Sequence, residues 1–298
     1  MKKVFALSIG LIMAVSVFGQ SIKVTPVLKK GMVKTYVTTT AATAMGQTVN
    51  LSYEQKYTVT NETANGYEMT MESTDFKSDG NSENLLSRLV TLGEEITKNS
   101  KVQMRLDKEG NVLEIINYEE VKAKSKATAD KLIDEIFNAS PEIAQVIKKE
   151  QLQEQLIAEL TPERLTKSMT LAASPLALFG RTITSGMQDT YENNMLTLKR
   201  IWLVTGKRIG ASAKTDMSRE DLKAYILKQV ERTAPQQAAM IKDNIDTVLD
   251  SGMMKLDVSE KANYELGDDL WVKSMDCTTD NDMLGQKSSS VVKIQLKN

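Results

Sequence analysis

The spacing of apolar residues changes twice along this chain, and this change constrains the fold more than any other feature. Before about residue 118, apolar and polar residues alternate, as at Val49, Leu51 and Tyr53. From about 118 to 178, apolar residues recur every three or four positions, and alternation returns near the carboxyl end. Alternation is typical of half-buried strands, and the longer spacing is typical of amphipathic helices.

The order strands, helices, strands predicts the α+β class. We expect a curved antiparallel sheet, built from N- and C-terminal hairpins, that packs against a central and a later block of helices. The helical block spans about 118–178, and a second helical pair spans about 218–251. Isolated helices need an apolar packing partner, which the sheet would provide. Residues 20–298 are therefore predicted to form a single domain.

Local signals mark individual turns and helix starts. Asn65-Gly66 predicts a hairpin turn because both residues tolerate positive φ, and residues 22–28 resemble a first strand. Helix starts are predicted at Ser82, for a helix reaching Ile96, at Ser140-Pro141, at Thr161-Pro162 and at Ser218 with Asp221.

The amino terminus has the features of an export signal. Lys2 and Lys3 precede an apolar run over residues 4–18, and cleavage after Gly19 would leave Gln20 as the first residue. A membrane anchor is the alternative, but the run is shorter than the ~20 residues that span a bilayer. We expect residues 1–19 to be removed and the protein to be periplasmic, associated with the cell envelope, or secreted. No later stretch predicts a transmembrane segment.

Composition excludes several classes of function. The chain has no histidine, which removes Ser-His-Asp catalysis and imidazole metal ligands. Its one cysteine, Cys277, cannot form an internal disulfide. The 38 Lys and Arg nearly balance the 39 Asp and Glu, which argues against nucleic-acid binding. No catalytic residue, cofactor or metal ligand is predicted.

Two acidic groups leave one enzymatic alternative open. Asp268-Asp269 and Asp280-Asn281-Asp282 lie near predicted strand ends. Paired carboxylates serve glycosidases, so a carboxylate-dependent hydrolase acting on glycans is an alternative function. Asp and Asn are also frequent in turns, which favours a loop interpretation.

Methionine suggests a different kind of site. Sixteen Met are spread along the chain, and Met recurs on surfaces that accept varied apolar ligands. The apolar run 171–179, broken by Pro175, is predicted to be buried under the sheet edge, or alternatively to be a flap over a groove. The residues predicted to line an apolar groove are Tyr53, Tyr57, Met69, Met71, Leu176, Phe179 and Trp271. An ordinary core is the alternative.

Several short segments together resemble a known family. The export signal, Lys29-Lys30-Gly31 followed by Tyr36, the strand pair around Gly110, and Leu270-Trp271-Val272 before Gly285-Gln286 are similar to a family of exported bacterial envelope proteins with no known activity. More distantly, a curved sheet covered by helices is similar to the lipoprotein carriers of the periplasm.

These features lead to one functional hypothesis with two alternatives. We expect a non-enzymatic envelope protein that binds a lipid, another apolar ligand or a partner protein between sheet and helices. The alternatives are the carboxylate-dependent hydrolase and a purely structural interaction module.

Overall fold

The computed structural model describes residues 19–44, 46–79, 101–139, 148–158, 160–193, 196–233, 238–250, 256–283 and 286–297. Apart from Gly19, the predicted export signal lies outside these ranges. The predicted helix from Ser82 to Ile96 and the predicted helix start at Ser140-Pro141 also lie outside them.

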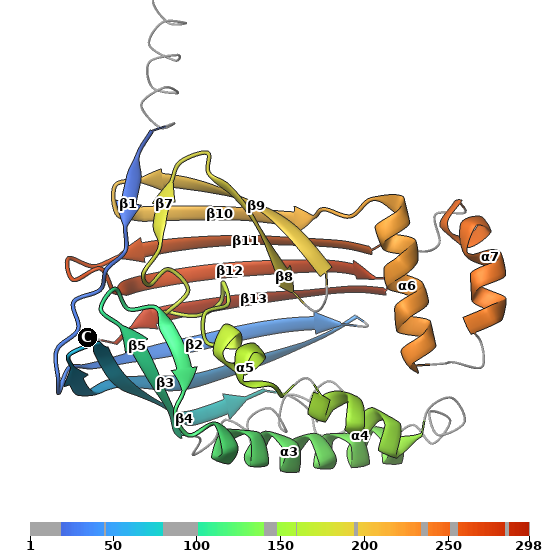
Figure 1. The fold of residues 1–298 in the computed structure, drawn as a ribbon, viewed down its shortest axis with the longest axis horizontal. Helices are drawn as coiled ribbons and strands as arrows, with labels where there is room; N and C mark the ends of the chain where they lie inside the picture. The colour runs from blue at the N-terminus through green and yellow to red at the C-terminus, as the bar shows by residue number, and fades with distance from the viewer. Residues whose placement is uncertain are drawn as a thin grey trace, which may run out of the picture.

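One antiparallel sheet of eleven strands dominates the molecule, in the order β6-β5-β4-β3-β2-β13-β12-β11-β10-β9-β8 (Figure 1). The strands are β2 Val33–Ala44, β3 Gln47–Thr63, β4 Gly66–Ser78, β5 Lys101–Asp107, β6 Val112–Ile115, β8 Gln188–Asn193, β9 Leu196–Thr205, β10 Arg208–Thr215, β11 Leu256–Leu266, β12 Val272–Met283 and β13 Gln286–Leu296. The predicted antiparallel sheet is thereby confirmed. β2 pairs with β13, with Thr38 opposite Ile294, so both ends of the chain share this sheet.

The two faces of the sheet differ in character. Burial alternates along β9, where Trp202 and Val204 are buried and the intervening Leu203 is 50% exposed. We call the face that carries Trp202 the inner face and the opposite one the outer face. Antiparallel sheets commonly bury one face and leave the other in water, and the outer face here carries mainly Thr, Ser and charged residues.

A non-helical part of the chain covers one end of the inner face. Residues 169–181, which we call the covering segment, place Leu176, Leu178 and Phe179 in the main core. Tyr264 on β11 donates a hydrogen bond of 2.7 Å to the carbonyl of Ala172. The predicted burial of this apolar run holds for residues 175–179, whereas Leu171 at its start is 39% exposed.

The amino-terminal residues complete this cover. β1 Ser21–Lys23 pairs with β7 Thr182–Thr184 in a separate two-stranded sheet. The predicted strand over 22–28 is therefore shorter and lies outside the main sheet. Trp271 Nε1 donates a hydrogen bond of 2.9 Å to the carbonyl of Val27, which ties this segment to β12.

The described helices are α3 Tyr118–Ala139, α4 Lys149–Ala158, α5 Pro162–Ser168, α6 Arg219–Thr233 and α7 Ala238–Asp250. α3 packs against α4 and α6 against α7, while α5 lies against the edge strand β6. In Figure 1, α6 and α7 lie beyond one end of the sheet. None of the described helices is long and apolar enough to cross a membrane.

The predicted α+β class, with two helical blocks covering a curved sheet, is therefore wrong, because the protein is mainly β. Helices do occur within 118–178 and 218–251. Their apolar spacing predicts a buried stripe but does not identify what buries it. α3 pairs with α4 and α6 with α7, and the described helices contribute only partly buried residues to the core clusters, such as Val121 and Leu165. The covering segment, interrupted by Pro175, instead places fully buried residues on the sheet.

Candidate functional site

The predicted groove residues occupy the packed end of the inner face. Six of them, Tyr57, Met69, Met71, Leu176, Phe179 and Trp271, are at most 8% exposed and belong to one core cluster. The Trp271 ring meets Phe179 edge-on at 5.0 Å and Tyr57 at 6.4 Å between ring centroids. These side chains fill the space between the sheet and the covering segment by packing against one another.

Tyr53, the seventh predicted groove residue, lies farther along the sheet. It is half-buried and stacks on Phe76, with ring centroids 5.1 Å apart. Burial raises the pKa of Tyr53, and a hydrogen bond with Thr38 partly opposes that effect. Tyr53 therefore marks the place where the tightly packed part of the inner face ends.

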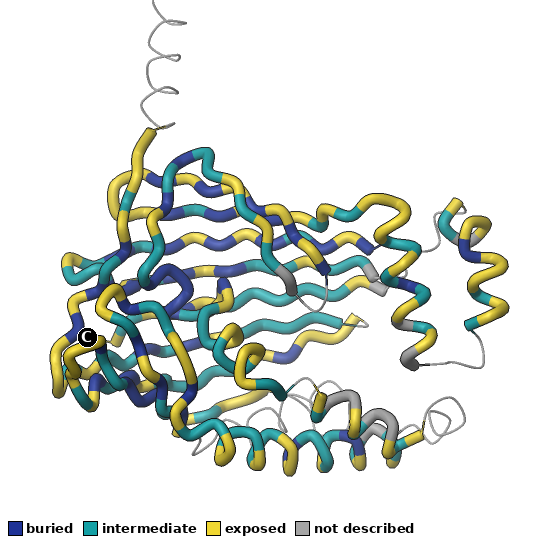
Figure 2. Tube along the Cα trace, in the orientation of Figure 1, coloured by how far each residue is buried: buried dark blue, intermediate teal, exposed yellow. Residues whose placement is uncertain are grey.

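Beyond Tyr53, the inner face stays apolar and part of it is less deeply buried, although Val49, opposite Ala42, is only 1% exposed. We call this surface the inner strip and define it by Thr40, Ala42, Leu51, Tyr53 and Val292, all of intermediate exposure. Thr40 lies opposite both Leu51 and Val292, so the strip crosses β3, β2 and β13. Figure 2 shows the same change from buried positions near the covering segment to intermediate positions on these strands.

A cluster of charged and aromatic residues borders the covered end, on β8, on β9 and at the last residue of the covering segment. Asp189 accepts hydrogen bonds from Arg200 Nε at 2.9 Å, Arg200 Nη2 at 2.7 Å, Arg181 Nη2 at 2.6 Å and Trp202 Nε1 at 3.1 Å. Partial burial raises the pKa of Asp189, but the bonds and charges of the two arginines outweigh it, and the pKa is lowered. We call these four residues the Asp189 cluster.

Tyr191 links this cluster to Glu260 on β11. The Arg200 guanidinium lies between the rings of Tyr191 and Trp202, 4.5 and 4.3 Å from their centroids. Tyr191 Oη donates a hydrogen bond of 2.7 Å to Glu260, which is only 7% exposed. Burial raises the pKa of the nearby Cys277 thiol to about 12, so it stays protonated and unreactive at neutral pH.

This cluster is not among the residues predicted from the sequence, although the sequence carries a signal for it. Asp189 and Tyr191 are two residues apart, as are Arg200 and Trp202. In two paired strands such residues share one face, and Asp189 lies opposite Arg200. A predicted hairpin between β8 and β9 would have brought them together.

The two acidic groups considered for catalysis lie at opposite ends of β12. Asp268 and Asp269 precede the strand and pair with Lys207 and Lys34, respectively. Asp280 and Asp282 lie near its other end, about 35 Å away for a strand of this length. The two groups therefore cannot act as one catalytic pair. Among the described residues, no group of three or more His, Cys, Asp or Glu is placed to hold a metal ion.

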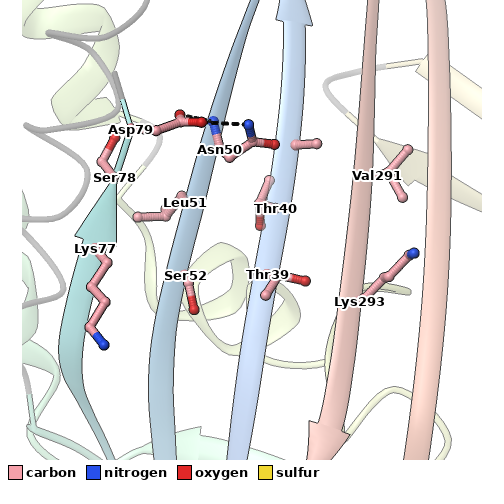
Figure 3. Close-up of a pocket in the computed structure, with 11 residues that line it drawn as sticks. Thr39, Thr40, Asn50, Leu51, Ser52, Lys77, Ser78, Asp79, Val291 and Lys293 are labelled. Carbon is pink, nitrogen blue, oxygen red and sulfur yellow. Dashed lines mark hydrogen bonds between the residues drawn. The ribbon is translucent and has the colours of Figure 1, made fainter. Parts of the chain in front are cut away.

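A shallow groove of about 630 Å³ lies across β13, β2, β3 and β4 (Figure 3). Its charged and hydroxyl side chains, such as Thr39, Lys77 and Lys293, belong to the outer face. Asp79 at its rim accepts hydrogen bonds from Asn50 N at 2.7 Å and Nδ2 at 2.6 Å. Ala41, Leu51 and Val291 also line this groove, so it combines an apolar floor with polar and charged side chains.

Comparisons with known proteins give no family for this chain. No protein-family profile matches it, and neither does any curated protein. A structure of lipovitellin with its lipid–protein interactions is similar at a TM-score of 0.37 and 10% identity, over 91% of this chain. This chain spans 25% of the lipovitellin chain.

A second similar structure is a protein from Bacteroides fragilis, described as exported and as having a YmcC-like fold. Its TM-score is 0.28 and its identity 9%, over 92% of this chain and 100% of that chain. At TM-scores below 0.5, neither similarity establishes a shared fold or a function.

Proposed function

We propose that this chain is an exported, non-enzymatic envelope protein that binds an apolar ligand, such as the acyl chain of a lipid, on the inner strip. The observation that carries the proposal is the half-buried apolar surface that continues the core beyond the covering segment. Each methylene group buried there would contribute about 0.8 kcal/mol. Apolar sites with a few polar groups at one end are typical of ligand pockets.

Export, the other part of the proposal, is supported by the amino-terminal sequence. Lys2 and Lys3, the apolar run and Gly19 form a signal pattern. Protein expressed with its own amino terminus in a bacterial host should be recovered from the periplasm with Gln20 as its first residue. An intact mass that includes residues 1–19 would contradict this expectation.

Two adjacent valines on β13 provide a matched test of ligand binding. Val292 belongs to the inner strip, whereas Val291 faces the outer side, and both are half-buried. We expect the purified protein to bind the fluorescent apolar probe N-phenylnaphthylamine. Val292→Asp should weaken binding by at least about tenfold, which corresponds to 1.4 kcal/mol, because the ligand would have to desolvate a carboxylate.

Val291→Asp should leave binding within about twofold of the wild type, since it adds the same charge to the opposite face. Circular dichroism would verify that both variants are folded. Equal binding by the two variants, or no binding by the wild type, would contradict the proposed site. Binding abolished in Val291→Asp alone would move the site to the outer groove.

A further inference from the structure

Glu260 is a buried carboxylate with few partners. It lies on the inner face of β11 and is 7% exposed. Within the described part of the chain, its hydrogen-bond donor is Tyr191, at 2.7 Å, and no Lys or Arg forms an ion pair with it. Burying a carboxylate is costly unless a cation or several donors compensate its charge.

The arginines of the Asp189 cluster do not form the ion pair that would compensate the charge of Glu260. Arg200 uses Nε and Nη2 on Asp189, and its guanidinium is enclosed by the rings of Tyr191 and Trp202. Arg181 also donates to Asp189. The side chain of Glu260 is thus left with accepting capacity that one tyrosine hydroxyl does not exhaust, since a carboxylate has about four lone-pair sites.

A row of small side chains connects Glu260 with the inner strip. Glu260 lies opposite Thr279, Thr279 opposite Ser290, and Ser290 opposite Ala42. These residues occupy one transverse row of the inner face, three strand spacings or about 14 Å long. An extended dodecyl chain can span this distance, so a ligand lying across the strands would reach both ends of the row.

We propose that Glu260 binds the cationic head group of an amphiphile, a primary ammonium that donates hydrogen bonds to its carboxylate. The alkyl chain then crosses Thr279 and Ser290 and ends on the inner strip. This inference rests on the proposed function and specifies its ligand class, namely lipids or long-chain amines with an ammonium group. A charge-assisted hydrogen bond is about twice as strong as a neutral one.

The test compares three amphiphiles of equal chain length as competitors of N-phenylnaphthylamine. Dodecylammonium should displace the probe from the wild type at a concentration at least about tenfold lower than dodecanol or dodecanoate. Glu260→Gln can still accept the Tyr191 hydroxyl but lacks the charge, so it should bind dodecylammonium and dodecanol equally. Glu265→Gln, on the outer face of the same strand, should keep the wild-type preference.

The outcomes separate this inference from the proposed function. Binding of all three amphiphiles without preference for the ammonium would refute the role of Glu260 but not the proposed function. The same holds for a preference that survives Glu260→Gln. Failure of all three to displace or bind would refute the proposed function as well. Because the head-group preference is measured first on the wild type, the test does not depend on the folding of a variant.

Discussion

Asp189 illustrates how single residues fix this structure. It joins Arg181, Arg200 and Trp202 from two chain segments through four hydrogen bonds. Asp189→Asn should lower the free energy of unfolding by about 3 kcal/mol, because Arg200, which is buried, would lose its counter-charge. Urea unfolding at neutral pH would measure this loss. Asp268→Asn, which affects an exposed pair with Lys207, is the control and should change stability very little.

The same carboxylate predicts a pH dependence. Its folded pKa is lowered, since the arginines outweigh the effect of burial, so its contribution to stability is complete above the unfolded pKa of about 3.9. The contribution disappears as the pH falls through the lower folded pKa. The stability difference between wild type and Asp189→Asn should therefore be constant from pH 7 to about 5 and should shrink below about pH 4. A difference that stays unchanged at lower pH would contradict this assignment.

Gly180, at the end of the covering segment, is another position where one residue type fits. Its φ is +72°, and a Cβ atom would lie 2.0 Å from the side-chain oxygen of Asn111. Gly206 has φ +61° with open space around it. Gly206→Ala should cost about 1 kcal/mol for the left-handed conformation alone, and Gly180→Ala should cost clearly more. Equal thermal unfolding midpoints for Gly180→Ala and Gly206→Ala would show that the Asn111 side chain moves away from the added methyl group freely.

At the scale of single secondary-structure elements, several predictions that rest on local sequence signals are confirmed. The alternation through Val49 and Tyr57 predicts β3, and β3 extends from Gln47 to Thr63. The predicted helix start at Thr161-Pro162 is confirmed, because Thr161 Oγ1 accepts a hydrogen bond from Arg164 N. The capping box is confirmed too, since Asp221 N donates to Ser218 Oγ. Each of these signals acts over a few neighbouring residues.

The packing partners of these elements could not be predicted in the same way. An apolar helical stripe is satisfied by a sheet or by another helix, and the sequence does not distinguish the two. Asp189 and Arg200 lie on the two strands of one hairpin, but only the sheet topology brings Glu260 on β11 close to them. The predicted groove residues were apolar by composition, and whether such residues line a groove or fill a core depends on the covering segment.

The covering segment should be held by Tyr264. Its buried hydroxyl donates to the carbonyl of Ala172, and Tyr264→Phe would leave that carbonyl without this donor. We expect a loss of about 1–2 kcal/mol and faster amide exchange in residues 169–181. Tyr67→Phe, which alters a half-buried tyrosine of β4, is the control and should leave exchange in this segment unchanged. Unchanged amide exchange in Tyr264→Phe would mean that apolar contacts alone hold the covering segment in place.

For the molecule as a whole, the pairing of β2 with β13 determines how it unfolds. The Tyr36 hydroxyl, buried on β2, donates a hydrogen bond of 2.8 Å to the carbonyl of Val272 on β12. The core cluster likewise includes residues from both ends of the chain. Elements that share one core unfold together, so we expect a single cooperative transition for residues 20–298.

The two tryptophans can report on this cooperativity, because Trp202 lies on β9 and Trp271 beside β12. In Trp202→Phe and in Trp271→Phe, the fluorescence of the remaining tryptophan and the far-UV circular dichroism should change at the same urea concentration. Each variant is its own control, because both signals are recorded on one protein whatever its stability. Two separated transitions in either variant would mean that the ends of the chain belong to independent units. The inner strip, which is built from both ends, would then lose its physical basis.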